Sequence, residues 1–124
     1  MTSLATAKFF TKAKDISATS GGASADVIYT CPNNFVSLIR FLHISNGDTQ
    51  KKISIQWFDA SDGASGTYHL LADEYKPSAH SLTEVVVGAY LALEAGDKIV
   101  AFKETGADMH ITVSGEEHYQ PTLI

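Results

Sequence analysis

Apolar residues recur after Asp26 in short runs that turn-forming residues separate, a pattern typical of β-sheet proteins. In residues 51–59, Ile53, Ile55 and Trp57 occupy alternate positions, so one strand should direct all three side chains into a core. About eight runs of this kind follow one another, and no long helical periodicity interrupts them. The pattern predicts an all-β fold, an antiparallel sandwich of about eight strands of jelly-roll or Greek-key type.

The connections between these strands can also be predicted. Residues 35–45 have apolar side chains at both parities, which indicates a central strand covered on both faces. Asn46 and Gly47 follow and favour a tight turn, so residues 35–59 should form a hairpin. A second hairpin is expected over residues 89–104, where a turn containing Gly96 separates two apolar runs.

Residues 72–80 contain Pro77 and show no clear period. They indicate a long crossover of the kind that a jelly-roll topology requires. Tyr75 lies within this segment. We expect it to be an exposed contact residue, because tyrosine offers a large apolar ring with a polar tip.

The two ends of the chain differ from its middle. Small residues dominate residues 17–24 and cannot anchor a core, whereas Phe9 and Phe10 lie in a short apolar and basic segment before them. We therefore expect an N-terminal arm with a flexible joint at 1–24, a β-sandwich domain at 25–119 and a C-terminal tail at 120–124.

The apolar residues of these ends lie where chains are usually frayed, so something should cover them. The candidates are Phe9 and Phe10 in the arm, and Leu123 and Ile124 in the tail. They either fold back onto the same sandwich or insert into a neighbouring copy, since exchanged arms are a simple route to symmetric assemblies. Together with Tyr75, they are the predicted partner-binding residues.

Composition narrows the choice of partner. The chain has 124 residues, of which 44% are hydrophobic and 19% charged, enough to form one folded domain. Its formal net charge is −5 and Arg40 is the only arginine, so direct binding of nucleic acid is not expected. No run approaches the roughly 20 apolar residues that cross a bilayer, and the N-terminus lacks the apolar core of a secretory signal. We expect no membrane partner.

The residues that could carry chemistry form no known catalytic motif. Because Cys31 is the only cysteine, the chain cannot form an intramolecular disulfide. Cys31 precedes Pro32 in an expected turn. Of the five histidines, His43, His69 and His110 lie on expected strands and could converge on a metal in a cupin-like enzyme. Ordinary hydrogen-bonded histidines explain the pattern better, because no metal-ligand spacing is present. We expect no enzyme, no cofactor and no metal.

Two further readings stay open at this point. Asp59 and Asp62 resemble a fragment of a calcium-binding loop, but the alternating oxygen ligands and the closing glutamate are missing. Sandwich proteins often bind sugars through loop aromatics and polar groups. Tyr68, Tyr75, Asp62 and Asn33 would be the contacts of such a carbohydrate-binding module.

Several short motifs carry a resemblance to a known group of proteins. They are Tyr29-Thr30-Cys31-Pro32 at the opening of a strand, RFLHISN at 40–46, ISIQWFDA at 53–60, YLALEAGDKIVAF at 90–102 and ITVSGEE at 111–117. Over roughly Asp26 to Tyr119, the sequence resembles small β-sandwich virion proteins of tailed bacteriophages. The N-terminal arm lies outside this match.

The resemblance implies a non-enzymatic structural protein that is made in the host cytoplasm and is present in several copies on the virion. Its partners would be copies of itself and other virion proteins, such as the major capsid protein or neck and tail proteins. A head decoration or cement protein is favoured by the short, acidic chain without a receptor-like extension. An accessory neck or tail protein is the alternative.

Overall fold

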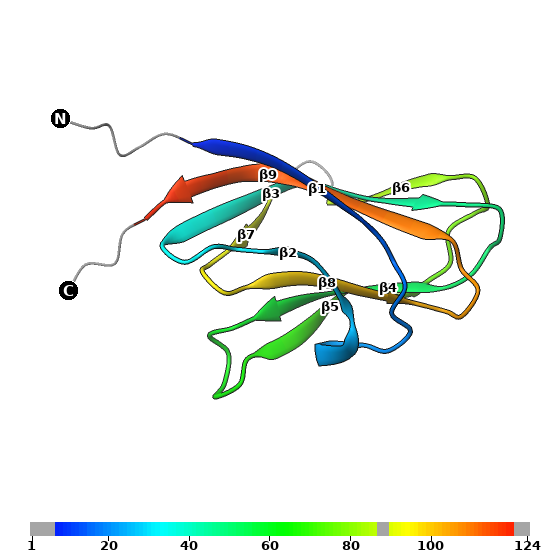
Figure 1. Cartoon of the computed structure of the whole chain (residues 1–124), viewed down its shortest axis with the longest axis horizontal. Coiled ribbons are helices and arrows are strands. Elements are labelled where there is room, and N and C mark those ends of the chain that lie inside the picture. Colours follow the sequence, from blue (N-terminus) through cyan, green and yellow to red (C-terminus); the bar gives the residue numbers. More distant parts are fainter. Residues whose placement is uncertain (1–6, 87–89, 121–124) are drawn as a thin grey trace.

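The computed structural model describes residues 7–86 and 90–120, so the predicted contact residues Leu123 and Ile124 lie outside the described part. The described residues form nine strands and one short 3-10 helix, arranged as two antiparallel sheets packed face to face (Figure 1). The elements are β1 (Lys8–Asp15), η1 (Gly22–Ser24), β2 (Asp26–Thr30), β3 (Phe35–Asn46), β4 (Ile53–Asp59), β5 (Thr67–Tyr75), β6 (Leu82–Val86), β7 (Leu91–Leu93), β8 (Lys98–Lys103) and β9 (Met109–Tyr119).

The strands pair from the outside of the sequence inwards. A five-stranded sheet has the order β1-β9-β3-β6, with β7 also paired to β3, and a four-stranded sheet has the order β2-β8-β4-β5. The first strand therefore pairs with the last, the second with the next to last, and β4 with β5. This nesting is the jelly-roll arrangement, so the predicted all-β sandwich is confirmed.

The core lies between the two sheets and consists mainly of branched aliphatic side chains. Trp57 packs against it, as the alternation with Ile53 and Ile55 predicts. β3 lies between β9 on one side and β6 and β7 on the other, so its predicted central position is confirmed. Among the described residues, the largest fully buried side chains are Ile16, Ile39, Leu42, Ile44, Ile53, Ile55, Leu93, Ile99, Val100, Met109, Ile111 and Val113.

Both predicted hairpins are wrong. β3 belongs to the five-stranded sheet and β4 to the four-stranded one, and β7 and β8 are divided in the same way. The turns between them are corners that lead the chain from one layer to the other. After β3, for example, the N–H of Gly47 donates to the carbonyl oxygen of Asp108, and the Asn46 side chain donates to the carbonyl oxygen of Pro77. These contacts fix the corner to neighbouring loops.

The expected crossover begins later than predicted. β5 continues through residues 72–75, so Tyr75 is the last residue of a strand and not part of a loop. Residues 76–81 then connect β5 in the four-stranded sheet to β6 in the five-stranded one. The change of layer is as expected, but the segment that makes it is short.

The N-terminal segment, predicted as an arm, forms part of the sandwich. Lys8–Asp15 is strand β1, and Ile16 after it is 1% exposed within the core. The chain has thus taken the alternative of folding back onto its own sandwich. An apolar residue at 16 anchors it, and this single residue is a weak signal in a sequence dominated by small and polar neighbours.

Residues 17–24, the expected joint, lie against the outer face of the four-stranded sheet (Figure 1). The N–H of Lys103 donates to the carbonyl oxygen of Ala18, and the N–H of Gly22 donates to the side chain of Gln56 over 2.9 Å. Asp26 accepts the N–H groups of Ser17 and Ala18 over 2.7 and 2.9 Å. Small residues suit this position because the backbone can approach the sheet closely.

The pairing of β9 with β3 depends on Gly115. It lies opposite Ile39, where the register of the two strands shifts, and a methyl group there would overlap the backbone carbonyl oxygen of Leu38. We predict that Gly115→Ala lowers the free energy of unfolding by roughly 1–3 kcal/mol, as overpacking does elsewhere. Urea denaturation would measure this. Ser114→Ala, one residue away on the outer face, is the control and should change stability by less than about 0.5 kcal/mol.

Asp26 should make the fastening of residues 17–24 dependent on pH. Burial by itself raises the pKa of Asp26, but the N–H groups of Ala18 and Ser17 and the nearby charge of Lys14 together lower it below its ordinary value. A carboxylate with a lowered folded-state pKa stabilises the fold above its unfolded pKa of roughly 4, and this contribution is lost as the pH falls through the folded-state value.

We therefore predict that Asp26→Ala lowers the free energy of unfolding by about 1 kcal/mol at neutral pH. The difference from the unchanged protein should shrink as urea titrations are repeated between about pH 5 and pH 2. Asp48→Ala, at an exposed loop position, is the matched control and should show little change. A difference that stays constant over this range would mean that the charge of Asp26 does not hold the segment.

Candidate interaction surface

The outer face of the five-stranded sheet carries a compact group of aromatic and charged side chains. Strand register places Phe9 of β1, Glu116 of β9 and Leu38 of β3 side by side across three strands. Arg40 reaches the Glu116 carboxylate at 3.4 Å and lies over the ring of Tyr90, 5.5 Å from its centre. We call Phe9, Leu38, Arg40, Tyr90, Glu116 and His118 the Glu116 patch.

Glu116 holds this patch together electrostatically. His118 Nε2 lies 2.8 Å from one carboxylate oxygen, and Arg40 lies near the other. The hydrogen bond with His118 lowers the pKa of Glu116, burial acts in the opposite direction, and Arg40 adds to the lowering. The carboxylate therefore stays charged at neutral pH and fixes the orientation of the one arginine of the chain.

The patch combines the residue types that dominate protein interfaces. Phe9 is 77% exposed and Tyr90 is 52% exposed, and arginine, tyrosine and other aromatic residues are enriched where proteins bind one another. Of these residues, only Phe9 is among the partner-binding residues predicted from the sequence. Arg40 stands out in the sequence as the only arginine, but its place beside Tyr90, Glu116 and His118 follows from the fold and has no local signal.

The other predicted contact residues lie elsewhere. Phe10 points to the opposite face of β1 from Phe9, where its ring stacks on Tyr29 with 4.3 Å between centres and 4° between planes. Tyr75 is 42% exposed but belongs to β5, at the edge of the other sheet. Phe9 and Tyr75 are therefore not parts of one surface, and Phe10 serves the fold.

Below Phe10 lies a buried polar network that connects the two sheets. The Tyr29 hydroxyl donates to Glu117 over 2.5 Å and lies 2.7 Å from the hydroxyl of Ser37, which in turn donates to the Cys31 thiol over 3.1 Å. Burial raises the pKa of Tyr29, and the hydrogen bond to Glu117 raises it further. Burial also raises the pKa of Cys31, which favours the protonated thiol over the thiolate.

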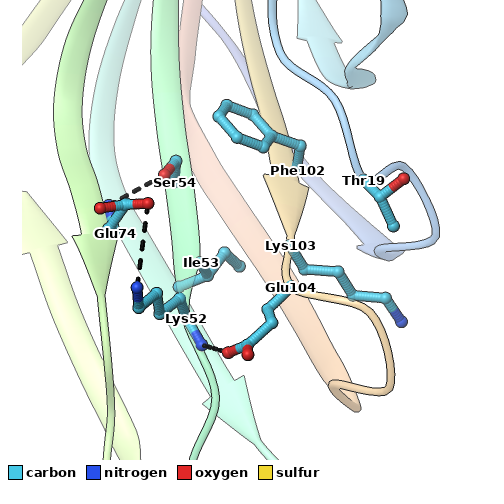
Figure 2. A pocket seen from close by; sticks show the side chains of 8 residues that line it. All are labelled: Thr19, Lys52, Ile53, Ser54, Glu74, Phe102, Lys103 and Glu104. Atoms are coloured by element: carbon cyan, nitrogen blue, oxygen red, sulfur yellow. Dashed lines mark hydrogen bonds and ion pairs between the residues drawn. The ribbon is translucent and has the colours of Figure 1, made fainter.

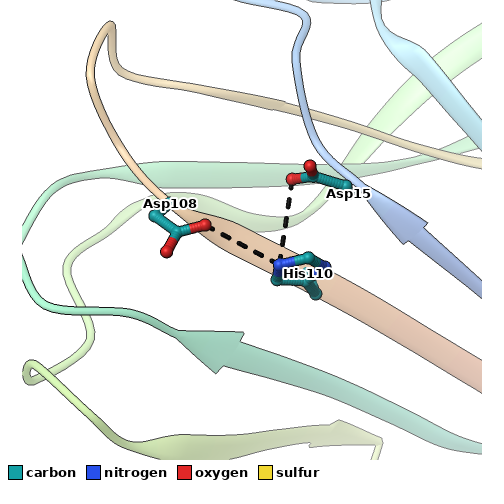
Figure 3. A group of neighbouring side chains, drawn as sticks. All are labelled: Asp15, Asp108 and His110. Atoms are coloured by element: carbon teal, nitrogen blue, oxygen red, sulfur yellow. Dashed lines mark ion pairs between the residues drawn. The ribbon is translucent and has the colours of Figure 1, made fainter.

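The three histidines considered for a metal site do not converge. His43 lies 3.3 Å from Glu84, and His69 lies 3.2 Å from Asp62 on the other sheet. His110 faces Asp15 at 3.9 Å and Asp108 at 3.7 Å (Figure 3). Each imidazole is thus paired with different carboxylates.

Two of these groups bring three potential ligand atoms within 4.8 Å of one another, namely Asp15, Asp108 and His110, and Asp59, Asp62 and His69. If a cation binds to the described residues, these are the places where it could be held. Both groups are largely open to water, and their geometry is equally that of ordinary ion pairs.

A small cavity of about 230 Å³ lies on the outer side of the four-stranded sheet (Figure 2). Its lining carries two lysines and two glutamates, so the opposite charges are equal in number. Lys52 Nζ lies 4.0 Å from Glu74, and the backbone N–H of Lys52 donates to the Glu104 carboxylate. The cavity is smaller than the 300 Å³ or more of typical ligand pockets. Its lining residues are Thr19, Lys52, Ile53, Ser54, Glu74, Phe102, Lys103 and Glu104.

The candidate sugar contacts do not line this cavity. Tyr68 packs against Phe58, with 4.6 Å between ring centres, and Tyr75 lies at the far end of the same strand. Seven residue steps along the strand place these two tyrosines roughly 20 Å apart. Asn33 lies in the turn between β2 and β3, and Asp62 pairs with His69. The four residues therefore do not form one site.

Comparison with known proteins adds little. Neither a protein-family model nor a curated protein matches the sequence. A solved structure entitled "Structure of infectious bursal disease virus Gt strain" is similar with a TM-score of 0.41 and 10% sequence identity. The likeness covers 90% of this chain and 32% of that chain, so the chain spans about a third of its length. A likeness of this size does not assign a function. The described residues include no helix long and apolar enough to span a membrane.

The opposite orientations of Phe9 and Phe10 lead to opposite expected effects. Phe10→Ala should lower the free energy of unfolding by about 2–4 kcal/mol, because the stacked ring that packs against the core is lost. Phe9→Ala should change it by less than about 0.5 kcal/mol, since its ring is in water. Urea denaturation of the two variants side by side would measure the contrast, and equal losses would contradict the assignment of the two faces.

Proposed function

We propose that this chain is a structural protein of a tailed-phage virion, a head decoration or cement protein that binds the particle surface as a homo-oligomer. The observation that carries the proposal is the Glu116 patch, an exposed group of aromatic and charged side chains on the outer face of one sheet. The resemblance of the strand and turn motifs to small virion proteins points in the same direction. The charge-compensated cavity and the buried thiol offer no comparable support for catalysis.

The two faces of the sandwich suit this role differently. Residues 17–24 lie against the outer face of the four-stranded sheet, whereas Phe9 and Tyr90 on the five-stranded sheet remain exposed. A partner that covers them would bury apolar rings around an arginine that is already oriented by Glu116. Each contact would be weak, but symmetry repeats it over many copies, so that the sum holds the particle together.

An accessory neck or tail protein would use the same surface, so the alternative differs from the main proposal only in the location on the particle. The test uses particles assembled without this chain, from the phage that encodes it. Purified protein added to them should sediment with the particles, and electron microscopy should show density on the head. Density on the neck or tail would favour the alternative, and no association would refute a virion role.

The patch can be tested by the same assay. We predict that Arg40→Ala combined with Phe9→Ala weakens binding to the particles at least tenfold, because two central contacts are removed from the patch. Leu70→Ala is the matched control, since Leu70 is exposed on the edge strand of the other sheet. Its binding should be unchanged, and equal weakening by both changes would place the docking surface elsewhere.

A further inference from the structure

β1 differs from the other edge strands of the sandwich in the regularity of its pairing. The register of β1 with β9 runs without a shift over all eight residues, from Lys8 opposite Glu117 to Asp15 opposite His110. The pairings β2 with β8, β3 with β6 and β4 with β5 all contain a register shift, and β7 has three residues. Such irregularities twist an edge and hinder the addition of another strand. Among the described strands, β1 is thus the best template for the addition of another strand.

The charges of β1 restrict what could pair with it. Lys8, Lys12 and Lys14 lie on the same side of β1 as Phe10, opposite to the side of Phe9. All three lysines are exposed. They form a basic stripe on a chain whose net charge is −5. A second copy of β1 would bring lysines opposite lysines, and like charges directly across a sheet are destabilising. Lysines on an edge are also a known protection against pairing of identical edges.

We propose that the edge of β1 facing away from β9, which pairs with no other described strand, accepts an extended acidic segment of a neighbouring protein. This segment adds to the five-stranded sheet as a further strand. The acidic residues of this segment would alternate and face Lys8, Lys12 and Lys14. The residues between them would be β-branched or aromatic and would lie beside Phe9. The inference rests on the proposed virion role, because it specifies the kind of neighbour that the surface binds.

In such a complex, the main chain and the side chains of β1 would contribute different properties of binding. Main-chain hydrogen bonds to the unpaired edge supply affinity, whatever the sequence of the added segment. The lysine stripe supplies selectivity, because opposite charges across the strands are favourable and like charges are not. Phe9, exposed next to the edge, provides an apolar contact for the side chain opposite it. An edge of this kind stays unpaired until an acidic strand is offered.

The test uses the full chain and synthetic peptides as probes. A blocked eight-residue peptide of alternating Glu and Val is titrated into isotope-labelled protein and followed by backbone NMR. We expect shifts and slowed hydrogen exchange in residues 8–15, and weaker binding at higher salt. A peptide of alternating Lys and Val should bind at least tenfold more weakly. No change in residues 8–15, or equal binding of both peptides, would overturn the proposal.

Charge reversal on the protein provides the second arm. Lys12→Glu combined with Lys14→Glu should invert the preference in favour of the Lys-Val peptide, and the NMR spectrum itself reports whether the variant is folded. If it is not, Lys12→Gln replaces it and should weaken binding of the Glu-Val peptide severalfold. Lys51→Glu combined with Lys76→Glu changes the net charge equally but away from β1. It should keep the original preference, and an inverted preference here would overturn the proposal.

The two proposals fail separately. Peptide binding reports on the β1 edge alone, whereas sedimentation with particles reports on the whole surface. Association with particles in the absence of any response to the acidic peptide would refute the acidic strand and leave the virion role intact. The reverse result would refute the virion role and leave an acidic strand as the ligand of β1.

Discussion

The hydroxyl of Tyr29 is the interaction on which the arrangement of the chain depends most. Tyr29 belongs to β2 in the four-stranded sheet, but its hydroxyl bonds to Glu117 and lies beside Ser37, both in the five-stranded sheet. The ring of Tyr29 stacks on the ring of Phe10 in β1. A buried group that lost its partner here would destabilise the fold by about 1–3 kcal/mol. The same residue thus joins the layers and positions β1, and with β1 the exposed ring of Phe9.

The sequence allowed the strands to be predicted better than their partners. Alternation at Ile53, Ile55 and Trp57 and the continuous apolar run of β3 reflect burial, which each strand shows by itself. The turns at Gly47 and Gly96 show only that the backbone bends. Whether the next strand stays in the sheet or enters the other layer depends on distant contacts, such as that of Gly47 with Asp108. Both predicted hairpins failed for this reason.

The candidate surface was predictable only in part for a related reason. Phe9 was found because an apolar residue near the end of a chain is unusual. Its separation from Phe10 follows from strand parity once β1 is known to be a strand. The meeting of Arg40 with Glu116 follows from neither, because the register of β3 with β9 shifts between Ile39 and Phe41. Such a bulge changes the direction of side chains and leaves no clear trace in sequence.

The pairing of the first strand with the last also has a mechanical consequence. Lys8 at the start of β1 lies opposite Glu117 near the end of β9, so both strands leave the sandwich at the same pole (Figure 1). Tension applied between these two ends would break the hydrogen bonds between the strands one after another. Tension applied between the Asp15 end of β1 and the Tyr119 end of β9 would load all of these hydrogen bonds together in shear. The pairing of β1 with β9 therefore resists force weakly in the first direction and strongly in the second.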